Sequence, residues 1–258
     1  MRTVANGQVR ERLRQLLVLR ARTLGLTPAA IDLLIATAVL ERSASGDEIV
    51  TAENGSQRVG FVVVGAAQVV CETPRGKRIG VCFVPPGRFI GAGWPGDEHA
   101  ARPDFRVLAH DPLGTIVALW TPRNIVEVLA TLTPQHAMQF VTESWRASTE
   151  VLRQKCHLLG YCLRDRVLAV LTTLAHDFGR PHPDGLRIEL RLTHLDLAGA
   201  AVGSRANVTR ALEELRAESL VAVEQHRLIV THRGLAGLSE DPSPPAGRWT
   251  EGLAIAAQ

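Results

Sequence analysis

The stretch from Leu192 to Thr231 constrains the fold more than any other part of this 258-residue chain. It reads LTHLDLAGAAVGSRANVTRALEELRAESLVAVEQHRLIVT. The pattern predicts a short helix, a tight turn, a second helix and two β-rich runs around a polar turn. This order is typical of a helix-turn-helix followed by a β-hairpin wing, whose second helix enters the DNA major groove. We therefore expect this part of the chain to bind double-stranded DNA.

The ends of both helices carry recognisable signals. Thr193 and Asp196 form a capping-box pattern at the start of the first helix. Gly203 is predicted to reverse the chain, because glycine accepts a positive φ without a Cβ clash. Ser204 is predicted to cap the second helix. The predicted buried faces are Leu195, Leu197, Ala198, Ala201 and Val202 on the first helix and Val208, Ala211, Leu212 and Leu215 on the second.

The predicted DNA-facing side lies at the start of the second helix. It comprises Ser204, Arg205, Ala206, Asn207, Thr209 and Arg210. An arginine guanidinium can bind O6 and N7 of guanine together, which distinguishes this base from the others. Ser204 and Asn207 are expected to hold phosphates, which position a helix without reading sequence. The alternative is a surface amphipathic helix that happens to carry two arginines.

At these residues the chain resembles the cyclic AMP receptor protein (CRP/FNR) family of bacterial transcription regulators, over roughly residues 30–238. The matching motifs are His182-Pro183-Asp184-Gly185, which leads into a predicted strand Leu186–Leu192, and Ser204-Arg205 followed by Val208-Thr209-Arg210. The resemblance implies that Arg205 and Arg210 read bases. Ala206 stands where the family usually has Glu, so the preferred site should differ there. The resemblance also implies that His182, Asp184 and Gly185 contact RNA polymerase, although a plain turn is the alternative.

The remaining pattern predicts an α+β protein. Between residues 45 and 119, short β-rich runs alternate with Gly and Pro turns, which favours a β-roll. The predicted strands are Val59–Val64, Ala67–Glu72, Arg78–Val84, Phe105–Ala109 and Thr115–Trp120, with helices over 10–20, 28–39, 122–131 and 163–178. The predicted domains are a cyclic-nucleotide-binding-like β-roll with N-terminal helices (1–121), a helical dimerisation region (122–160), a winged helix-turn-helix (161–238) and a flexible tail (239–258).

Thr133-Pro134 opens a helix that is predicted to run to residue 160. At 1.5 Å per residue it would be about 40 Å long, which is unusual within one small domain. Apolar residues recur along it in steps of three and four: Phe140, Val141, Trp145, Val151, Leu152, Leu158 and Leu159. We expect this stripe to join two subunits, as the helix does in the family. A core helix packed on the β-roll is the alternative.

The family resemblance also places a phosphate-binding cassette in the β-roll, but the sequence departs from it. Candidate ligand-binding residues are Arg88, Gly91, Ala92, Arg102 and Arg106. Ala92 replaces the Glu that would hold ribose hydroxyls, and Asp104 puts a negative charge near the phosphate position. Losing a charged hydrogen bond costs about 1.5–3 kcal/mol. We therefore expect regulation that is independent of cyclic AMP, and no cofactor.

Four alternatives for the sensor stay open: a β-roll with no ligand, a different ligand held by Arg88, Arg102 or Arg106, a haem or metal site, and a redox sensor built on the cysteines. The candidate haem or metal ligands are His99, His110 and His157. Two other functions compete with regulation: a cupin-like metal or small-molecule protein, and a dimerising module that does not itself read DNA. No catalytic triad or Walker loop is present in the sequence, so an enzyme is not expected.

Composition sets broader limits. The net charge is +3 and the pI about 8.9, which permits nucleic-acid binding without requiring it. No run of about 18 apolar residues exists, so no membrane span is predicted. Cys71, Cys82, Cys156 and Cys162 are scattered rather than paired at metal or redox spacing. These features predict a reduced, cytoplasmic protein.

Overall fold

The computed structural model describes residues 2–3, 7–49, 52–53, 56–72, 78–90 and 105–237. The chain divides into two compact units, Met1–Thr149 and Glu150–Gln258. The helices of the first unit are α1 (Gly7–Leu24), α2 (Pro28–Thr37), α3 (Pro122–Ala130) and the start of α4 (Pro134–Leu158), which continues into the second unit. Its strands are β1 (Arg2–Thr3), β2 (Val39–Ser43), β3 (Ala52–Glu53), β4 (Ser56–Gln57), β5 (Val59–Val64), β6 (Ala67–Glu72), β7 (Arg78–Val84), β8 (Phe89–Ile90), β9 (Phe105–Ala109) and β10 (Thr115–Trp120).

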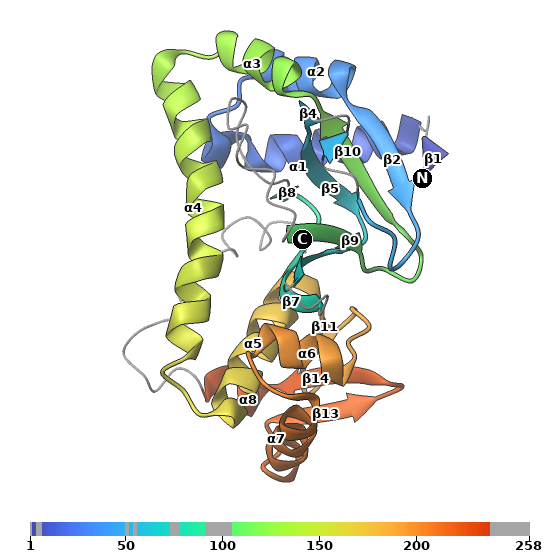
Figure 1. The fold of residues 1–258 in the computed structure, drawn as a ribbon, viewed down its shortest axis with the longest axis vertical. Helices are drawn as coiled ribbons and strands as arrows, with labels where there is room; N and C mark the ends of the chain where they lie inside the picture. Colours follow the sequence, from blue (N-terminus) through green and yellow to red (C-terminus); the bar gives the residue numbers. More distant parts are fainter. Residues whose placement is uncertain are drawn as a thin grey trace. The chain divides into compact units, whose positions relative to one another are not determined.

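Two antiparallel sheets form the β-roll of the first unit (Figure 1). One has the order β1-β2-β10-β5-β8 and the other the order β7-β6-β9. Alternate residues of the central strands face opposite cores. Phe61 and Val63 of β5 pack in the cluster formed with helices α1 to α4, whereas Val62 between them packs in a second cluster with Val107 and Ala109 of β9. One face of the larger sheet is therefore covered by helices and the other by the smaller sheet.

The five strands predicted between residues 59 and 120 are confirmed with the same bounds. The N-terminal region differs from the prediction. The first helix is longer than 10–20, and Val39, predicted to be helical, begins strand β2. The helix ends because Ala38 is extended (φ −65°, ψ 128°), and Val39 then pairs with Leu119. Tertiary pairing with β10 thus overrides the helical spacing of the apolar residues before it.

The start of helix α4 packs on its own unit. Phe140 is buried, and its ring centroid lies 5.6 Å from that of Phe89 in β8. The side-chain amide of Gln139 donates to the carbonyl oxygens of Arg22 (2.7 Å) and Thr23 (3.0 Å) at the end of α1. The prediction that Phe140 belongs to a subunit seam is therefore wrong, because this ring completes the core beneath the sheet.

In the part of the second unit that the structure describes, a small antiparallel sheet and four helices follow the end of α4. Its elements are α5 (Leu163–Phe178), β11 (Gly179–His182), β12 (Gly185–Ile188), α6 (His194–Ala200), α7 (Arg205–Ala217), β13 (Val221–Glu224), β14 (Arg227–Thr231) and α8 (His232–Ala236). The strand order is β11-β12-β14-β13. The strand predicted over Leu186–Leu192 is shorter and begins one residue earlier, as β12 runs from Gly185 to Ile188; the Glu189 N–H, just after it, donates to the Phe178 carbonyl oxygen at the end of α5 (3.0 Å).

Candidate nucleic-acid interface

Helix α6 begins at the predicted capping box. The Thr193 hydroxyl oxygen accepts from the Asp196 amide (3.1 Å), and the Asp196 carboxylate accepts from the Thr193 amide (2.8 Å). Leu197, Ala198 and Ala201 are buried as predicted. The prediction for Leu195 is wrong, since this side chain is 61% exposed on the outer face of a helix only two turns long. The cap therefore fixes where α6 starts, while three small or medium apolar residues attach it to the unit.

The turn between α6 and α7 is made differently from the prediction. Val202, not Gly203, adopts the left-handed conformation, with φ at 53°. Val202 is also 47% exposed rather than part of the buried face. Gly203 serves another purpose, because a Cβ atom there would lie 2.7 Å from Leu163 Cδ1 of α5. A larger residue at position 203 would displace the end of the Leu163 side chain, so packing favours glycine there, while a β-branched residue bears the strained backbone.

Helix α7 presents a polar, basic start and a buried apolar face. The Ser204 hydroxyl oxygen accepts from the Asn207 amide (3.3 Å), which confirms the predicted cap. All four predicted core residues, Val208, Ala211, Leu212 and Leu215, are buried. The predicted DNA-facing side chains Ser204, Arg205, Ala206, Asn207 and Arg210 are exposed, and Thr209 is half-buried. The structure therefore gathers the predicted residues at the start of α7, where all but Thr209 are exposed.

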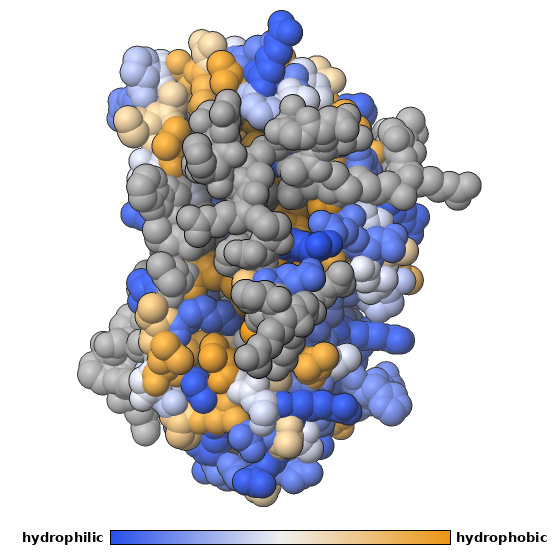
Figure 2. All heavy atoms as spheres, viewed as in Figure 1, coloured by the Kyte–Doolittle hydropathy of each residue, from blue (hydrophilic) through white to orange (hydrophobic). Residues whose placement is uncertain are grey.

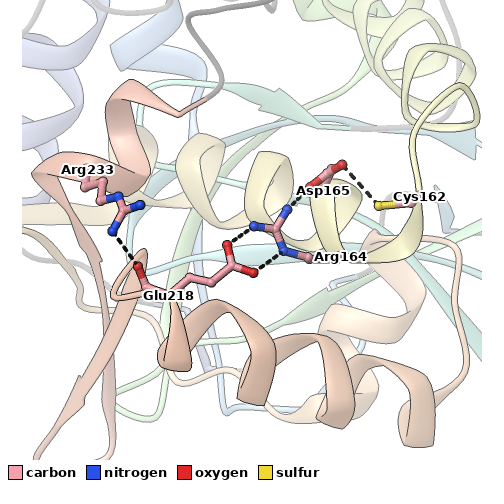
Figure 3. A network of polar contacts seen from close by, with 5 residues as sticks. All are labelled: Cys162, Arg164, Asp165, Glu218 and Arg233. Carbon is pink, nitrogen blue, oxygen red and sulfur yellow. Dashed lines mark hydrogen bonds and ion pairs between the residues drawn. The ribbon is translucent and has the colours of Figure 1, made fainter.

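The other end of α7 is fastened to α5 by a cluster of charges (Figure 3). Arg164 of α5 makes two parallel hydrogen bonds to the Glu218 carboxylate, one of them 3.1 Å long, and also contacts Asp165. The hydrogen bond to Glu218 is the main reason that the pKa of Arg164 is raised. Arg233 of α8 donates to the Glu218 carbonyl oxygen (3.2 Å), and the Cys162 thiol to Asp165 (3.1 Å). Because Arg164 and Glu218 are 54 positions apart, sequence pattern gave no signal for this pair.

The wing is a two-residue β-hairpin. Glu224 pairs with Arg227 across it, and both loop residues, Gln225 (φ 49°) and His226 (φ 61°), are left-handed. This combination is a type I′ turn, whose twist matches that of the flanking strands. Both loop residues are exposed. The wing tip thus projects a polar side chain and an imidazole next to the helix-turn-helix that precedes it.

The candidate polymerase loop is the turn between β11 and β12. The Asp184 amide donates to His182 Nδ1 (3.3 Å), so His182 Nε2 carries the proton and donates to the Glu224 carboxylate (2.9 Å). A Cβ atom on Gly185 would lie 2.1 Å from the Val230 carbonyl oxygen, so only glycine fits. Pro183 and Asp184 are exposed at the tip. The loop is therefore fixed at its base and accessible at its end.

Only some of the candidate ligand-binding and metal-ligating residues of the β-roll lie within the described residues. Gly91, Ala92, Arg102, Asp104 and His99 lie outside them. Arg88 is half-buried beside Gly87, which has φ at 85°.

Arg106 is held by two carboxylates, Glu48 (2.9 Å) and Glu72 (3.1 Å). These two carboxylates already neutralise the guanidinium, and their negative charge opposes the approach of a phosphate. The His110 ring packs against Phe83, with centroids 4.8 Å apart. All four cysteines are free thiols. Within the described ranges, no group of three or more His, Cys, Asp or Glu side chains is placed to hold a metal ion.

The hydropathy of the surface agrees with a polar interface at α7. In Figure 2 the part of the molecule where α7 lies in Figure 1, at the lower end, is mainly hydrophilic. Arg205, Arg210 and Arg216 of this helix are all exposed. Among the helices that the structure describes, none has both the length and the apolar character that a bilayer span requires.

Comparisons with known proteins find a match for the second unit of the chain. Residues 165–239 match the Crp-like helix-turn-helix domain. The global nitrogen regulator of Synechococcus elongatus is 42% identical over 86 residues, which are 32% of this chain and 39% of that protein. The regulator of the same name from Nostoc is 25% identical over 178 residues, covering 68% of this chain and 77% of its own length. The chain thus spans less than two fifths of the first curated relatives that it matches.

Solved structures extend the likeness to the whole fold. The c-di-GMP-responsive global regulator CLP of Xanthomonas campestris superposes with a TM-score of 0.61 at 18% identity, over 80% of this chain and 99% of that one. A transcriptional regulator of the CRP family from Thermus thermophilus gives 0.59 at 22% identity, over 77% and 94%. The predicted α+β fold, a β-roll followed by a winged helix-turn-helix, is confirmed, as is the resemblance to the CRP/FNR family.

Proposed function

We propose that this chain, which joins a Crp-like helix-turn-helix domain to the fold of the CRP/FNR regulators, is a homodimeric transcription regulator that reads a two-fold symmetric DNA site without cyclic AMP. The observation that carries the proposal is the start of α7. Two arginines and two small polar side chains are exposed there, on a helix whose opposite face is fully buried. Helix α7 is capped by Ser204 at one end and tied to α5 through Glu218 at the other.

The side chains on α7 suit base reading. Arg205 and Arg210 are exposed, and among the described residues no hydrogen bond or ion pair engages either guanidinium. Both are thus available to bind guanine O6 and N7. Ala206 lies between them and offers only a methyl group, which can contact a thymine methyl but cannot accept from cytosine N4. The preferred half-site should therefore depart from the family's common one at the base pair opposite Ala206.

A homodimer is supported by the exposed residues along α4. Met138 is 65% exposed, and Leu159, directly after the helix, is 62% exposed. These two positions are three heptads apart, and Trp145 and Leu152 occupy the heptad positions between them. A stripe with this period is typical of a two-stranded coiled-coil seam. Two copies joined in this way would present two α7 helices to half-sites about one helical turn apart.

Independence from cyclic AMP is supported by the chemistry of the cassette residues. Ala92 has no carboxylate to hold ribose hydroxyls, and Asp104 adds a charge that repels phosphate. Arg106 is already paired with Glu48 and Glu72. A cyclic nucleotide would therefore lose the contacts that the family uses, and its phosphate would meet an arginine that already faces two carboxylates.

The arginines provide a direct test of DNA reading. Arg205→Ala and Arg210→Ala should each weaken binding to a selected duplex by roughly 5- to 150-fold, because each bidentate base contact contributes roughly 1–3 kcal/mol. Arg216→Ala is the matched control, since Arg216 is an exposed arginine on the same helix but in its last turn. Fluorescence anisotropy measures all three. Equal effects of the three substitutions would contradict base reading by the start of α7.

We also propose that the tip of the β11–β12 turn contacts RNA polymerase. Pro183 and Asp184 are exposed there, while His182 and Gly185 are fixed within the unit. Asp184→Ala leaves the Gly185 backbone and the His182–Glu224 contact intact. It should reduce activated transcription in vitro while the affinity for DNA stays unchanged. Full activation by Asp184→Ala protein would contradict the contact.

A further inference from the structure

One polar contact links the two helices of the helix-turn-helix. His194 is the first residue of α6, and its Nδ1 lies 2.8 Å from the Thr209 hydroxyl oxygen of α7. The same hydroxyl lies 3.0 Å from the carbonyl oxygen of Arg205, one turn earlier in α7. Both His194 and Thr209 are half-buried. The contacts form a continuous chain from the imidazole of α6 to the backbone of the first residue of α7.

The number of available protons fixes which group donates in each of these two hydrogen bonds. A threonine hydroxyl has one proton to donate, and a carbonyl oxygen can only accept. Both short contacts are satisfied when Thr209 donates to the Arg205 carbonyl and accepts from His194. The imidazole must then carry a proton on Nδ1. If Thr209 donated to His194 instead, the 3.0 Å contact to Arg205 would join two acceptors.

This arrangement changes what Thr209 can do. Its only proton is used within the helix, so the hydroxyl cannot also donate to a base edge. Thr209 was predicted to lie on the DNA-facing side with the arginines. In the structure its hydroxyl instead connects α6 to the backbone of Arg205, whose guanidinium lies on the exposed face.

We propose that His194 is a positioning residue for base reading, which acts through the Thr209 hydroxyl to hold the first turn of α7 against α6. The inference rests on the proposed DNA-binding function. The α6–α7 turn contains a strained Val202, so the turn alone does not favour this geometry. A displacement of about 1 Å is enough to spoil a bidentate hydrogen-bond pair, so the contact should affect discrimination between bases more than general attraction to DNA.

Paired substitutions separate positioning from simple stability. The amide nitrogen of Asn can take the place of His Nδ1, whereas that of Gln takes the place of Nε2. His194→Ala and His194→Gln should each lower affinity for a selected duplex about fivefold, the size expected for one hydrogen bond, with little change for a random-sequence duplex. His194→Asn should rescue most of the loss. Thr209→Val should lose as much affinity for the selected duplex as His194→Ala. The double variant should bind no more weakly than either single variant, because both substitutions remove the same linked hydrogen bonds.

The outcomes distinguish this inference from the proposed function. Failure of the wild-type protein to prefer any duplex sinks the proposed function. A wild-type preference that His194→Ala leaves intact, or equal losses on selected and random duplexes, overturns the role of His194 alone. Nitrogen-15 NMR of the wild-type imidazole gives a check that needs neither DNA nor a variant. A proton on Nδ1 is expected, and a proton on Nε2 alone would contradict the proposed hydrogen bonds.

Discussion

At the scale of single residues, the turn between α6 and α7 depends on two neighbours with opposite requirements. Val202 has φ at 53° although it is β-branched, and a Cβ atom on Gly203 would lie 2.7 Å from Leu163 Cδ1. A left-handed conformation costs a non-glycine residue roughly 1–2 kcal/mol. The fold tolerates this cost because α6 and α7 are held on both sides of the turn by their caps and buried faces.

Val202→Gly should therefore stabilise the protein. Glycine adopts the left-handed conformation without this penalty. Its more flexible unfolded state lowers the free energy of unfolding by about 0.5–1 kcal/mol, and little buried area is lost because the position is half-exposed. We expect the free energy of unfolding to rise by about 0.5–1 kcal/mol, measured by chemical denaturation. Val202→Ala, which keeps a Cβ atom, is the control and should lie closer to wild type. A glycine variant less stable than the alanine variant would contradict the strain.

The same two residues show where sequence interpretation reaches its limit. The glycine signal correctly located the turn, but it could not distinguish a glycine needed for its φ from one needed for space. That distinction depends on Leu163, which is 40 positions earlier in the chain. The His194–Thr209 contact was missed for a similar reason, since it joins two helices across a turn of unknown geometry. Caps were predictable because they depend on residues only three positions apart.

At the scale of elements, the start of α7 combines a helix cap with the proposed contact to a DNA phosphate. The Ser204 hydroxyl satisfies an amide at the helix N-terminus, where the backbone also favours negative charge. The same N-terminus is expected to face the DNA backbone. Stability and DNA binding therefore place different demands on this one position.

Substitutions at Ser204 should separate these two demands. Ser204→Ala removes the cap and should cost about 1 kcal/mol of stability. Ser204→Asp keeps an acceptor and suits the helix N-terminus, so its melting temperature should stay near that of wild type. Its charge should repel phosphate, so DNA affinity should fall below that of the alanine variant. An aspartate variant that binds DNA as tightly as wild type would show that Ser204 does not face the backbone.

Elements with local signals were predictable, and elements defined by distant partners were not. The five longer strands between residues 59 and 120 were predicted correctly because turn residues and β-branched runs mark them, whereas the two-residue strand β8 was not predicted. Val39–Ser43 was missed because only pairing with β10 makes it a strand. Phe140 looked like part of a seam because its spacing suits both a subunit contact and a core, and the ring of Phe89 decides between them.

At the scale of the whole molecule, regulation of the proposed kind needs two copies of the DNA-binding unit. The start of α4 is committed to its own β-roll through Phe140, while Met138, two residues away, is exposed. A helix that buries Phe140 in its own core and exposes an apolar side chain at Met138 is suited to dimerisation.

Charging the uncovered face should separate the subunits. Met138→Glu combined with Leu159→Glu should convert a dimer to a monomer at micromolar concentration in sedimentation velocity, because like charges would meet across the seam. Leu113→Glu is the control, since Leu113 is 82% exposed in a turn of the β-roll. DNA affinity should fall with loss of the dimer. A double variant that stays dimeric would place the subunit contact elsewhere.

The central claim is that a dimer of this chain reads a symmetric DNA site without cyclic AMP. The most direct test is selection of bound sequences from a random duplex library, using the full-length protein with and without cyclic AMP. We predict enrichment of the same two-fold symmetric site in both conditions, with a departure from the family's half-site opposite Ala206. Enrichment only in the presence of cyclic AMP, or no enrichment in either condition, would contradict the claim.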